Sequence, residues 1–471
     1  MATILIDKNV MVPMRDGVRL ATDVYWLDGA APAPVLLSRT PYDKEHALVG
    51  STGVPFDILR AVQAGYAVMI QDVRGRYGSE GEFDPMFQET RDGVDTIAWA
   101  AGQPWSRGVV GTFGGSYVGG TQWLPAREHP PALRAMAPAV TFSDMYEGNT
   151  YQGGAKVLHD LRWVVADIIP GEIRRRVMRG GKPPEGAASL DVNAVLADLP
   201  LADHPLIRAL APFYGDWLAH STPDAYWRPI SPSTGYEQIT APSLNISGWY
   251  DIFLWSTFQN YLGMRQRGGT ERTRRNQRVI IGPWTHMNFT GSFPEREFGV
   301  AGSHDAIDLT GIQLRWFDRW LKEADNGVEE EPPVMLFVMG IDAWRTEADW
   351  PLPDTDFTGK LVDVYPDGRA LILTEGILRA RYRTSFTAPE LLEPDAIYEL
   401  RLDLWATANV FLPGHRIRLE VSSSNFPRFN RNSNTGGEIA SEAADHYRPA
   451  INRIFHDVAH PSRLILPIIE R

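Results

Sequence analysis

Apolar residues in the first hundred positions of the chain follow two alternating patterns. Runs rich in β-branched and aromatic residues, each followed by turn residues, cover 19–26, 35–38 and 66–72 and predict strands. Between and after them, 56–64 and 91–102 carry apolar residues at helical spacing. Strands and helices in alternation predict a mostly parallel sheet that is covered by helices on both faces.

The segment 108–120 (GVVGTFGGSYVGG) joins a short apolar run to a cluster of glycines around Ser116. The pattern predicts a buried strand that turns sharply at the serine and continues as a helix, because glycine tolerates backbone conformations and close approaches that side chains forbid.

Helical patterns dominate the region from about 144 to 235. The stretches 155–168 and 189–198 space Trp, Leu and Val for one apolar face, and strand signals are few. We interpret this region as a helical cap inserted into the α/β core.

The α/β pattern resumes after the insertion. Strand-like runs cover 243–247, 278–281 and 334–339, and a helix is expected around 310–324. The predicted catalytic α/β domain therefore consists of 1–143 and 236–350, interrupted by the cap at 144–235.

The pattern of residues 351–471 predicts short strands separated by turn residues. Examples are 361–365, 396–405 and 416–422, and this spacing is typical of an antiparallel β sandwich. We expect a separate C-terminal β domain.

The composition of the chain excludes several kinds of partner and catalytic site. The net charge of −12 argues against nucleic acid or an anionic membrane surface as a partner. The absence of cysteine excludes disulfides, a cysteine nucleophile and thiolate metal sites. Paired metal-ligand spacings such as H-E-x-x-H are missing, and no motif implies a cofactor. Without a signal peptide or an apolar run of membrane-spanning length, a soluble, cytoplasmic protein is expected.

Ser116 is the candidate nucleophile. Gly114, Gly115 and Gly119 surround it, as the strained turn of a nucleophile elbow requires. The general elbow pattern has Gly two residues after the serine, whereas Val118 stands there in this chain. Taken alone, the motif fits a Gly-rich turn with a structural serine equally well.

Two further strand ends carry the residues that a serine nucleophile needs. ISGWYD ends at Asp251 and IIGPWTH ends at His286. Either residue alone is more often a turn acid or a loop histidine. Ser, Asp and His nevertheless occur in the chain order of an α/β-hydrolase, each after a buried strand. The sequence therefore predicts a catalytic triad of Ser116, Asp251 and His286, and the backbone N–H of Tyr117 as one oxyanion donor.

These residues and their surroundings resemble the CocE/NonD family of hydrolases. The resemblance rests on RTPYDK (39–44), RGRYGSEG (74–81), FGGSYVG (113–119), GWYD (248–251), GPWTH (282–286) and SSNFPRFNRNSNTGG (423–437). These motifs span nearly the whole chain and include segments without a catalytic duty. The family's own elbow pattern, G-x-S-Y-x-G, accommodates Val118.

The resemblance implies an α/β-hydrolase core, an inserted helical cap and a C-terminal β jelly roll. It also implies that the hydroxyl of Tyr42 is the second oxyanion donor. Aromatic side chains hold the acyl group in such enzymes, and by position these are Phe253, Trp163 and Tyr151. Plain core packing is the alternative for all three.

One departure from the family concerns the β domain. Family members carry a long stretch, with the first jelly-roll strands, between segments that resemble WPLP (350–353) and DTDFTGKL (354–361). Here the two segments are joined directly. A jelly roll shortened in this way leaves sheet edges and apolar faces uncovered, which favours association and makes a homodimer an expectation.

The sequence thus predicts a serine carboxylesterase that hydrolyses a small-molecule ester with a bulky or aromatic acyl group. Amide or peptide cleavage, as in X-Pro dipeptidyl-peptidases and acylases, is the first alternative. An aminopeptidase needs an acidic cluster for the substrate ammonium, and we interpret Asp160 and Asp167 as the solvated face of the cap instead. An inactive remnant with a truncated β domain is the second alternative.

Overall fold

The computed structural model describes residues 3–49, 52–186, 191–197, 200, 204–339, 342–347, 360–392, 397–422, 425, 428–429 and 457–466. The chain forms two compact units. The first consists of Met1–Asp144 and Arg228–Trp350, and the second of Met145–Trp227 and Pro351–Arg471.

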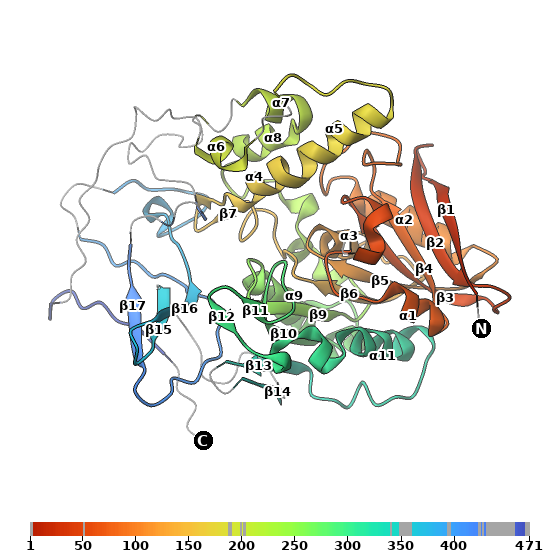
Figure 1. Cartoon of the computed structure of the whole chain (residues 1–471). Helices are drawn as coiled ribbons and strands as arrows, with labels where there is room; N and C mark the ends of the chain where they lie inside the picture. Colours follow the sequence, from red (N-terminus) through yellow and green to blue (C-terminus); the bar gives the residue numbers. More distant parts are fainter. Residues whose placement is uncertain are drawn as a thin grey trace. The chain divides into compact units, whose positions relative to one another are not determined.

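A mixed sheet of ten strands forms the centre of the first unit (Figure 1). Its spatial order is β1 (Ile4–Pro13), β2 (Arg19–Leu27), β4 (Ala67–Asp72), β3 (Ala33–Thr40), β5 (Ser106–Gly115), β6 (Leu133–Ala139), β9 (Leu244–Tyr250), β10 (Arg278–Thr285), β13 (Val334–Val338) and β14 (Ala343–Glu347). The strands from β4 to β13 run parallel, whereas β1, β2 and β14 pair antiparallel at the two ends. The carboxyl ends of the central strands therefore share one edge.

Helices cover both faces of this sheet. The helices of the first unit are α1 (Ile58–Gln63), α2 (Glu89–Ala101), α3 (Tyr117–Ala126), α9 (Leu254–Arg267), α10 (Glu271–Arg275) and α11 (Leu309–Leu321). A short hairpin and 3-10 turns complete it: β11 (Ser292–Phe293), β12 (Arg296–Glu297), η1 (Lys44–Val49), η5 (Arg228–Ile230), η6 (Pro232–Thr234), η7 (Tyr236–Gln238), η8 (Val300–Gly302) and η9 (His304–Ile307).

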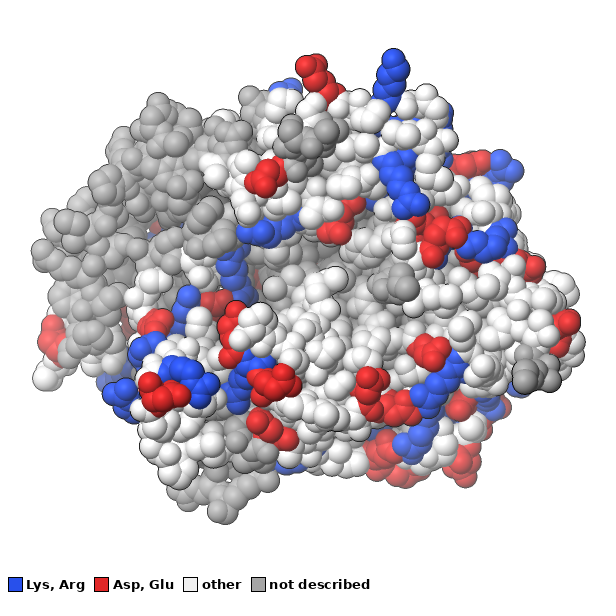
Figure 2. All heavy atoms as spheres, in the orientation of Figure 1, with Lys and Arg blue, Asp and Glu red and all other residues white. Residues whose placement is uncertain are grey.

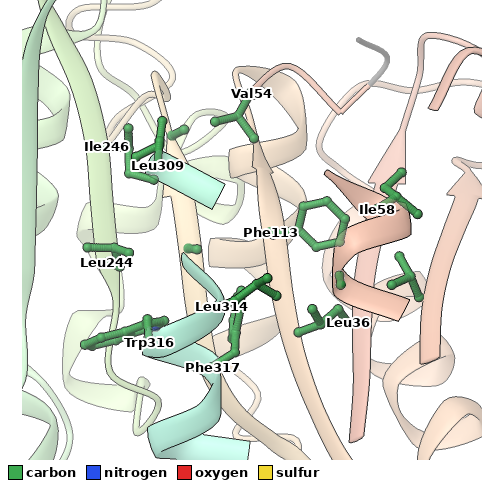
Figure 3. Close-up of a cluster of buried hydrophobic side chains, with 14 of the residues drawn as sticks. Leu36, Val54, Ile58, Phe113, Leu244, Ile246, Leu309, Leu314, Trp316 and Phe317 are labelled. Carbon is green, nitrogen blue, oxygen red and sulfur yellow. The ribbon is translucent and has the colours of Figure 1, made fainter. Parts of the chain in front are cut away.

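Alternation along the strands sorts side chains between two cores. Leu36 packs in a cluster with Phe113, α1 and Phe317 of α11 (Figure 3). Its neighbour Leu37 belongs to a second cluster with α2, α3 and Met264 of α9. Successive side chains of a strand point to opposite faces, so the near-continuous apolar runs of β3 and β4 are those of strands buried on both sides.

The second unit contains helices and a small β sheet. Its elements are β7 (Tyr151–Gln152), β8 (Ala155–Lys156), α4 (His159–Trp163), the π-helical turn η2 (Val164–Ile168), α5 (Ile169–Met178), α6 (Val192–Ala197), α7 (Pro205–Leu210), α8 (Phe213–Ala219), η10 (Ala380–Tyr382), β15 (Lys360–Val364), β16 (Ala370–Glu375) and β17 (Arg416–Glu420). The last three strands pair antiparallel in the order β16-β15-β17.

Hydrogen bonds join the two chain segments of the second unit. Arg379 donates from its backbone N–H to the carbonyl of Gly153 at 2.7 Å and from Nη1 to the carbonyl of Gly154 at 3.0 Å. The N–H of Leu158 donates to the carbonyl of Arg428 at 3.1 Å. Residues of the predicted cap thus contact residues of the predicted β domain, and the division into three domains stays a prediction.

The predicted fold class is confirmed: a mostly parallel α/β sheet with helices is accompanied by a smaller antiparallel β domain. Three local predictions differ from the structure. The stretch 155–168 begins as β8 before it turns helical. The described residues of 396–405 form no strand. Leu404 of this stretch packs in a small hydrophobic cluster with Leu361 and Leu373.

The third difference concerns Asp160, which does not lie on a solvated face. It is 3% exposed and forms an ion pair with Lys156, the last residue of β8, four positions earlier in the chain. Burial holds the pKa of its carboxyl up at about 6, and the lysine partly offsets that effect. Asp167 is exposed, as expected.

Candidate active site

Ser116 lies at a strained turn between β5 and α3. Its φ of 59° and ψ of −126° are rare for a residue with a side chain. The surrounding backbone fixes this conformation: the N–H of Ser116 donates to the carbonyl of Ala139 at 2.9 Å, and Thr141 Oγ1 donates to the carbonyl of Ser116 at 2.7 Å. The turn leaves Ser116 itself partly exposed.

The glycines around Ser116 are required by space. A Cβ at Gly115 would lie 2.2 Å from the carbonyl oxygen of Gly53, and one at Gly119 would lie 2.5 Å from Cβ of Thr141. Val118, by contrast, is completely buried among its neighbours. In this chain the helix therefore needs glycine at the third position after the serine and accepts a side chain at the second.

Three side chains that follow strands of the same sheet form one hydrogen-bonded chain. His286 Nε2 lies 3.0 Å from Ser116 Oγ, and His286 Nδ1 lies 2.8 Å from Asp251 Oδ1. Asp251 directly follows β9 and His286 directly follows β10, at the edge where open α/β sheets place functional groups. The structure thus brings together the three residues that the sequence singles out.

The surroundings of Asp251 fix the roles of the two imidazole nitrogens. The aspartate side chain is fully buried, and Ser247 Oγ donates to its second oxygen at 2.7 Å. A buried carboxylate at Nδ1 favours the tautomer with the proton on Nδ1. Nε2 is then an acceptor for the Ser116 hydroxyl.

Phe253 packs against the histidine. Its ring meets the imidazole of His286 edge to face at 5.3 Å between centroids, and it meets Phe142 in the same manner at 6.4 Å. The predicted acyl-binding residue therefore lies beside His286 of the hydrogen-bonded chain, and its contact with substrate stays a prediction.

Tyr117 begins α3, so its backbone N–H belongs to the first turn, whose N–H groups have no acceptor within the helix. Its buried side chain is held elsewhere: the hydroxyl donates to Glu89 Oε1 at 2.7 Å and accepts from the N–H of Met86 at 3.3 Å. Arg39 Nη1 lies 2.8 Å from the other oxygen of Glu89. Burial raises the pKa of both the Tyr117 hydroxyl and the Glu89 carboxyl.

Tyr42 follows β3, the strand that pairs with β5. The register places Leu37 beside Thr112, so the end of β3 lies next to the strand end that carries Ser116. This topology brings the segment of Tyr42 to the edge of the sheet where Ser116, Asp251 and His286 lie.

Trp163 and Tyr151 lie in the second unit. The Trp163 indole stacks on Trp217 at 6.2 Å with an interplanar angle of 7°. Tyr151 is buried, stacks on Tyr146 at 4.9 Å and donates from its hydroxyl to the carbonyl of Trp217 at 3.2 Å. Both belong to an aromatic cluster within residues 145–227 of the second unit, and their contact with substrate stays a prediction.

The sequence did not predict two residues that support the site, Glu89 beside Tyr117 and Ser247 beside Asp251. Ser247 precedes the predicted acid by four residues in a strand, and Glu89 opens a helix. Serines and acidic residues at such positions are common, so the sequence offered no signal that distinguishes them.

On the face shown in Figure 2, the described charged side chains form no pattern typical of a polyanion site. Acidic and basic side chains are interspersed on the face shown in Figure 2, without a broad basic area. Among the residues that the structure describes, no group of three or more His, Asp or Glu side chains is placed to hold a metal ion. None of the described helices is long and apolar enough to cross a membrane.

Two family models match the chain. Residues 16–288 match the X-Pro dipeptidyl-peptidase (S15 family) model, and residues 352–465 match the X-Pro dipeptidyl-peptidase C-terminal non-catalytic domain.

Among curated proteins, the cocaine esterase of Rhodococcus sp. (strain MB1 Bresler) is 36% identical to the chain, and the alignment covers 99% of each. This alignment runs over 577 positions, whereas the chain has 471 residues, so more than one hundred positions are occupied by the relative alone.

Solved structures share the fold. An α-amino acid ester hydrolase matches with a TM-score of 0.76 at 22% identity over 94% of this chain and 93% of the other. An aminopeptidase from a marine sediment Thaumarchaeota archaeon matches with 0.73 at 22% over 95% and 93%. A CocE/NonD family hydrolase from Staphylococcus aureus matches with 0.65 at 18% over 99% and 94%.

Proposed function

Because the chain belongs to the CocE/NonD family of hydrolases, we propose that it is a serine carboxylesterase acting on a small-molecule ester with a bulky or aromatic acyl group. The observation that carries the proposal is the unbroken hydrogen-bonded chain from Ser116 through His286 to Asp251. A serine hydroxyl that donates to a neutral imidazole, itself oriented by a buried carboxylate, is equipped to attack a carbonyl carbon.

Acylation follows from the roles of the two imidazole nitrogens. Nε2 of His286 accepts the proton of Ser116 as Oγ attacks the ester carbonyl. Asp251 stabilises the resulting imidazolium through Nδ1. The imidazolium then donates its proton to the departing alcohol, leaving the acyl group on Ser116.

Deacylation repeats the sequence with water. His286 accepts a proton from the attacking water, and the second tetrahedral intermediate collapses with return of the proton to Ser116 Oγ. In both halves of the reaction the negative oxygen needs donors, and we assign these to the N–H of Tyr117 and the hydroxyl of Tyr42.

The preference for an ester rests on the relative with the name cocaine esterase, to which the chain is 36% identical over 99% of both lengths. An aromatic acyl group suits the edge-to-face pair of Phe253 and Phe142 beside the imidazole. Trp163 and Tyr151 are proposed to contact the same group from the cap.

The test is the hydrolysis of a matched ester and anilide that share a benzoyl group, by the wild type and by Ser116→Ala. We expect kcat/KM for the ester to exceed that for the anilide, and Ser116→Ala to lose both activities. A faster anilide would instead assign the chain to amide hydrolysis. A well-folded wild type that is inert toward both would identify it as an inactive remnant.

A further inference from the structure

The segment RGRYGSEG (74–81) is part of the family resemblance but contains none of the residues assigned to catalysis. In the structure it forms a turn directly after β4, the strand beside β3. Tyr42 lies just beyond β3, so the turn and the loop of residues 41–44, here called the Tyr42 loop, leave neighbouring strand ends.

Two side chains, one from this turn and one from the end of β4, bind the Tyr42 loop at both of its ends. Arg76 Nε donates to the carbonyl of Pro41 at 3.1 Å. Asp72, the last residue of β4, accepts from the backbone N–H of Lys44 at 2.8 Å. Tyr42 lies between these two contacts.

Both side chains are themselves fixed. Arg76 is 1% exposed, and its guanidinium lies over the rings of Tyr77 and Phe83 at 5.1 and 5.2 Å. Asp72 is also 1% exposed and accepts a second bond from the N–H of Gly78 at 3.2 Å. Groups packed in this way hold their partners with little freedom.

The Tyr42 loop needs such support because its backbone is strained. Asp43, the residue after Tyr42, has a φ of 74°, a conformation that residues with side chains rarely adopt. Strained conformations persist where the surrounding structure over-determines them, and they cluster at active sites. The buried Lys44 adds an ion pair with Asp23 at 3.0 Å to the same loop.

We propose that Arg76 and Asp72 are positioning residues that hold the Tyr42 loop and thereby direct the Tyr42 hydroxyl toward the oxyanion. The proposal rests on the proposed function and assigns a role to the turn that catalysis leaves unexplained. The negative charge on the oxygen develops only in the transition state and the tetrahedral intermediate. A displaced donor therefore weakens transition-state stabilisation and leaves ground-state binding almost unchanged, so the loss belongs to kcat rather than KM.

The experiment is a double-mutant comparison with 4-nitrophenyl acetate as substrate. Arg76→Met is measured in the wild type and in Tyr42→Phe. We expect Arg76→Met to lower kcat roughly 10- to 100-fold in the wild type, by analogy with other small misplacements of catalytic groups. In the Tyr42→Phe background, with the hydroxyl already gone, the further loss should stay below about threefold because the two changes remove the same interaction.

Arg74→Met is the matched control from the same turn. The Arg74 guanidinium pairs with Asp92 and Asp16, outside the Tyr42 loop, so its removal should leave kcat within about threefold of the wild type. Should Arg76→Met fail to fold, Asp72→Asn takes its place, because an amide oxygen can replace only part of the carboxylate's acceptor capacity.

Three results would overturn the assignment: equal losses from Arg76→Met in both backgrounds, equal losses from Arg74→Met and Arg76→Met, or full activity of Tyr42→Phe. A wild type without Ser116-dependent hydrolysis would instead refute the proposed function. The two failures are therefore distinguishable.

Discussion

At the residue scale, the hydrogen-bonded chain that links Ser116, His286 and Asp251 continues to a fourth side chain. Ser247 donates to the oxygen of Asp251 that faces away from His286. With both carboxylate oxygens occupied, the aspartate cannot rotate freely, and its orientation sets that of the imidazole. The orientation of the imidazole beside Ser116 thus depends on Ser247, which is three hydrogen bonds away from Ser116.

Replacement of Asp251 should change the orientation of the His286 imidazole without changing substrate binding. Asp251→Asn presents an amide to Nδ1 and favours the wrong imidazole tautomer, so we expect kcat to fall by about 10⁴ with little change in KM. Ser247→Ala keeps the carboxylate and should cost far less. Steady-state kinetics of both variants would check this, and equal losses would contradict the ranking.

The meeting of Ser116, Asp251 and His286 could be predicted from the sequence because each directly follows a strand with a clear apolar pattern. The supporting residues could not. Glu89 meets Arg39 and Tyr117 only after three separate segments have folded together, and no local spacing encodes such a meeting.

At the scale of elements, the contact between α3 and the loop after β6 depends on the absence of a side chain at Gly119. Gly119→Ala forces a Cβ to within 2.5 Å of Cβ of Thr141. We expect a loss of roughly 1–3 kcal/mol in the free energy of unfolding, together with a reduced kcat.

Urea unfolding of Gly119→Ala beside Gly215→Ala would test this contact. Gly215 lies inside α8 with open space around its Cα, so alanine there should be neutral or slightly stabilising. Equal stability of the two variants would contradict the account of the elbow.

Asp72 at the end of β4 should make the free energy of unfolding depend on pH. Burial raises the pKa of Asp72 from 3.8 to about 7, although its hydrogen bonds and Lys44 oppose the shift. In the folded state the carboxyl therefore retains a proton that the unfolded chain releases near pH 4. The carboxyl of Asp72 therefore contributes fully to the free energy of unfolding below about pH 4, and this contribution is lost as the pH rises through 7.

Unfolding of the wild type and Asp72→Asn at pH 5 and pH 8 measures this effect. Relative to the variant, the wild type should lose on the order of 2 kcal/mol over that interval. A stability difference that does not change with pH would show that Asp72 is ionised throughout.

Helices and strands could be predicted where the spacing of apolar residues was clear. The predictions were wrong where tertiary contacts determine the local structure. The core strands β2, β3 and β4 lie where their apolar runs predict. Lys156 and Asp160 follow a helical spacing, but Lys156 belongs to the short strand β8 and forms a buried ion pair with Asp160. Charged residues in a core cannot be inferred from a hydrophobic pattern.

At the scale of the whole molecule, the C-terminal part carries many exposed apolar side chains. Among the described residues, those at least half exposed there include Leu391, Ile397, Ile417, Val421, Val458 and Ile465. Family resemblance predicts a shortened jelly roll, and the curated relative fills more than one hundred alignment positions that this chain lacks. Apolar surface of this kind promotes association.

We therefore expect the chain to self-associate in a concentration-dependent manner. Ile417 lies on β17 and is 50% exposed, so Ile417→Lys should shift the distribution toward monomer. Sedimentation velocity over a concentration series would reveal the shift. A wild type that remains monomeric throughout would contradict the expectation.

The central claim, that Ser116 is an activated nucleophile, is tested most directly by covalent labelling. The wild type and Ser116→Ala are treated with a fluorophosphonate, and their intact masses and peptide maps are recorded. We predict one adduct per wild-type chain, located on Ser116, and none on the variant. A wild type that unfolds cooperatively yet takes up no label, or a variant labelled as fully as the wild type, would contradict the account.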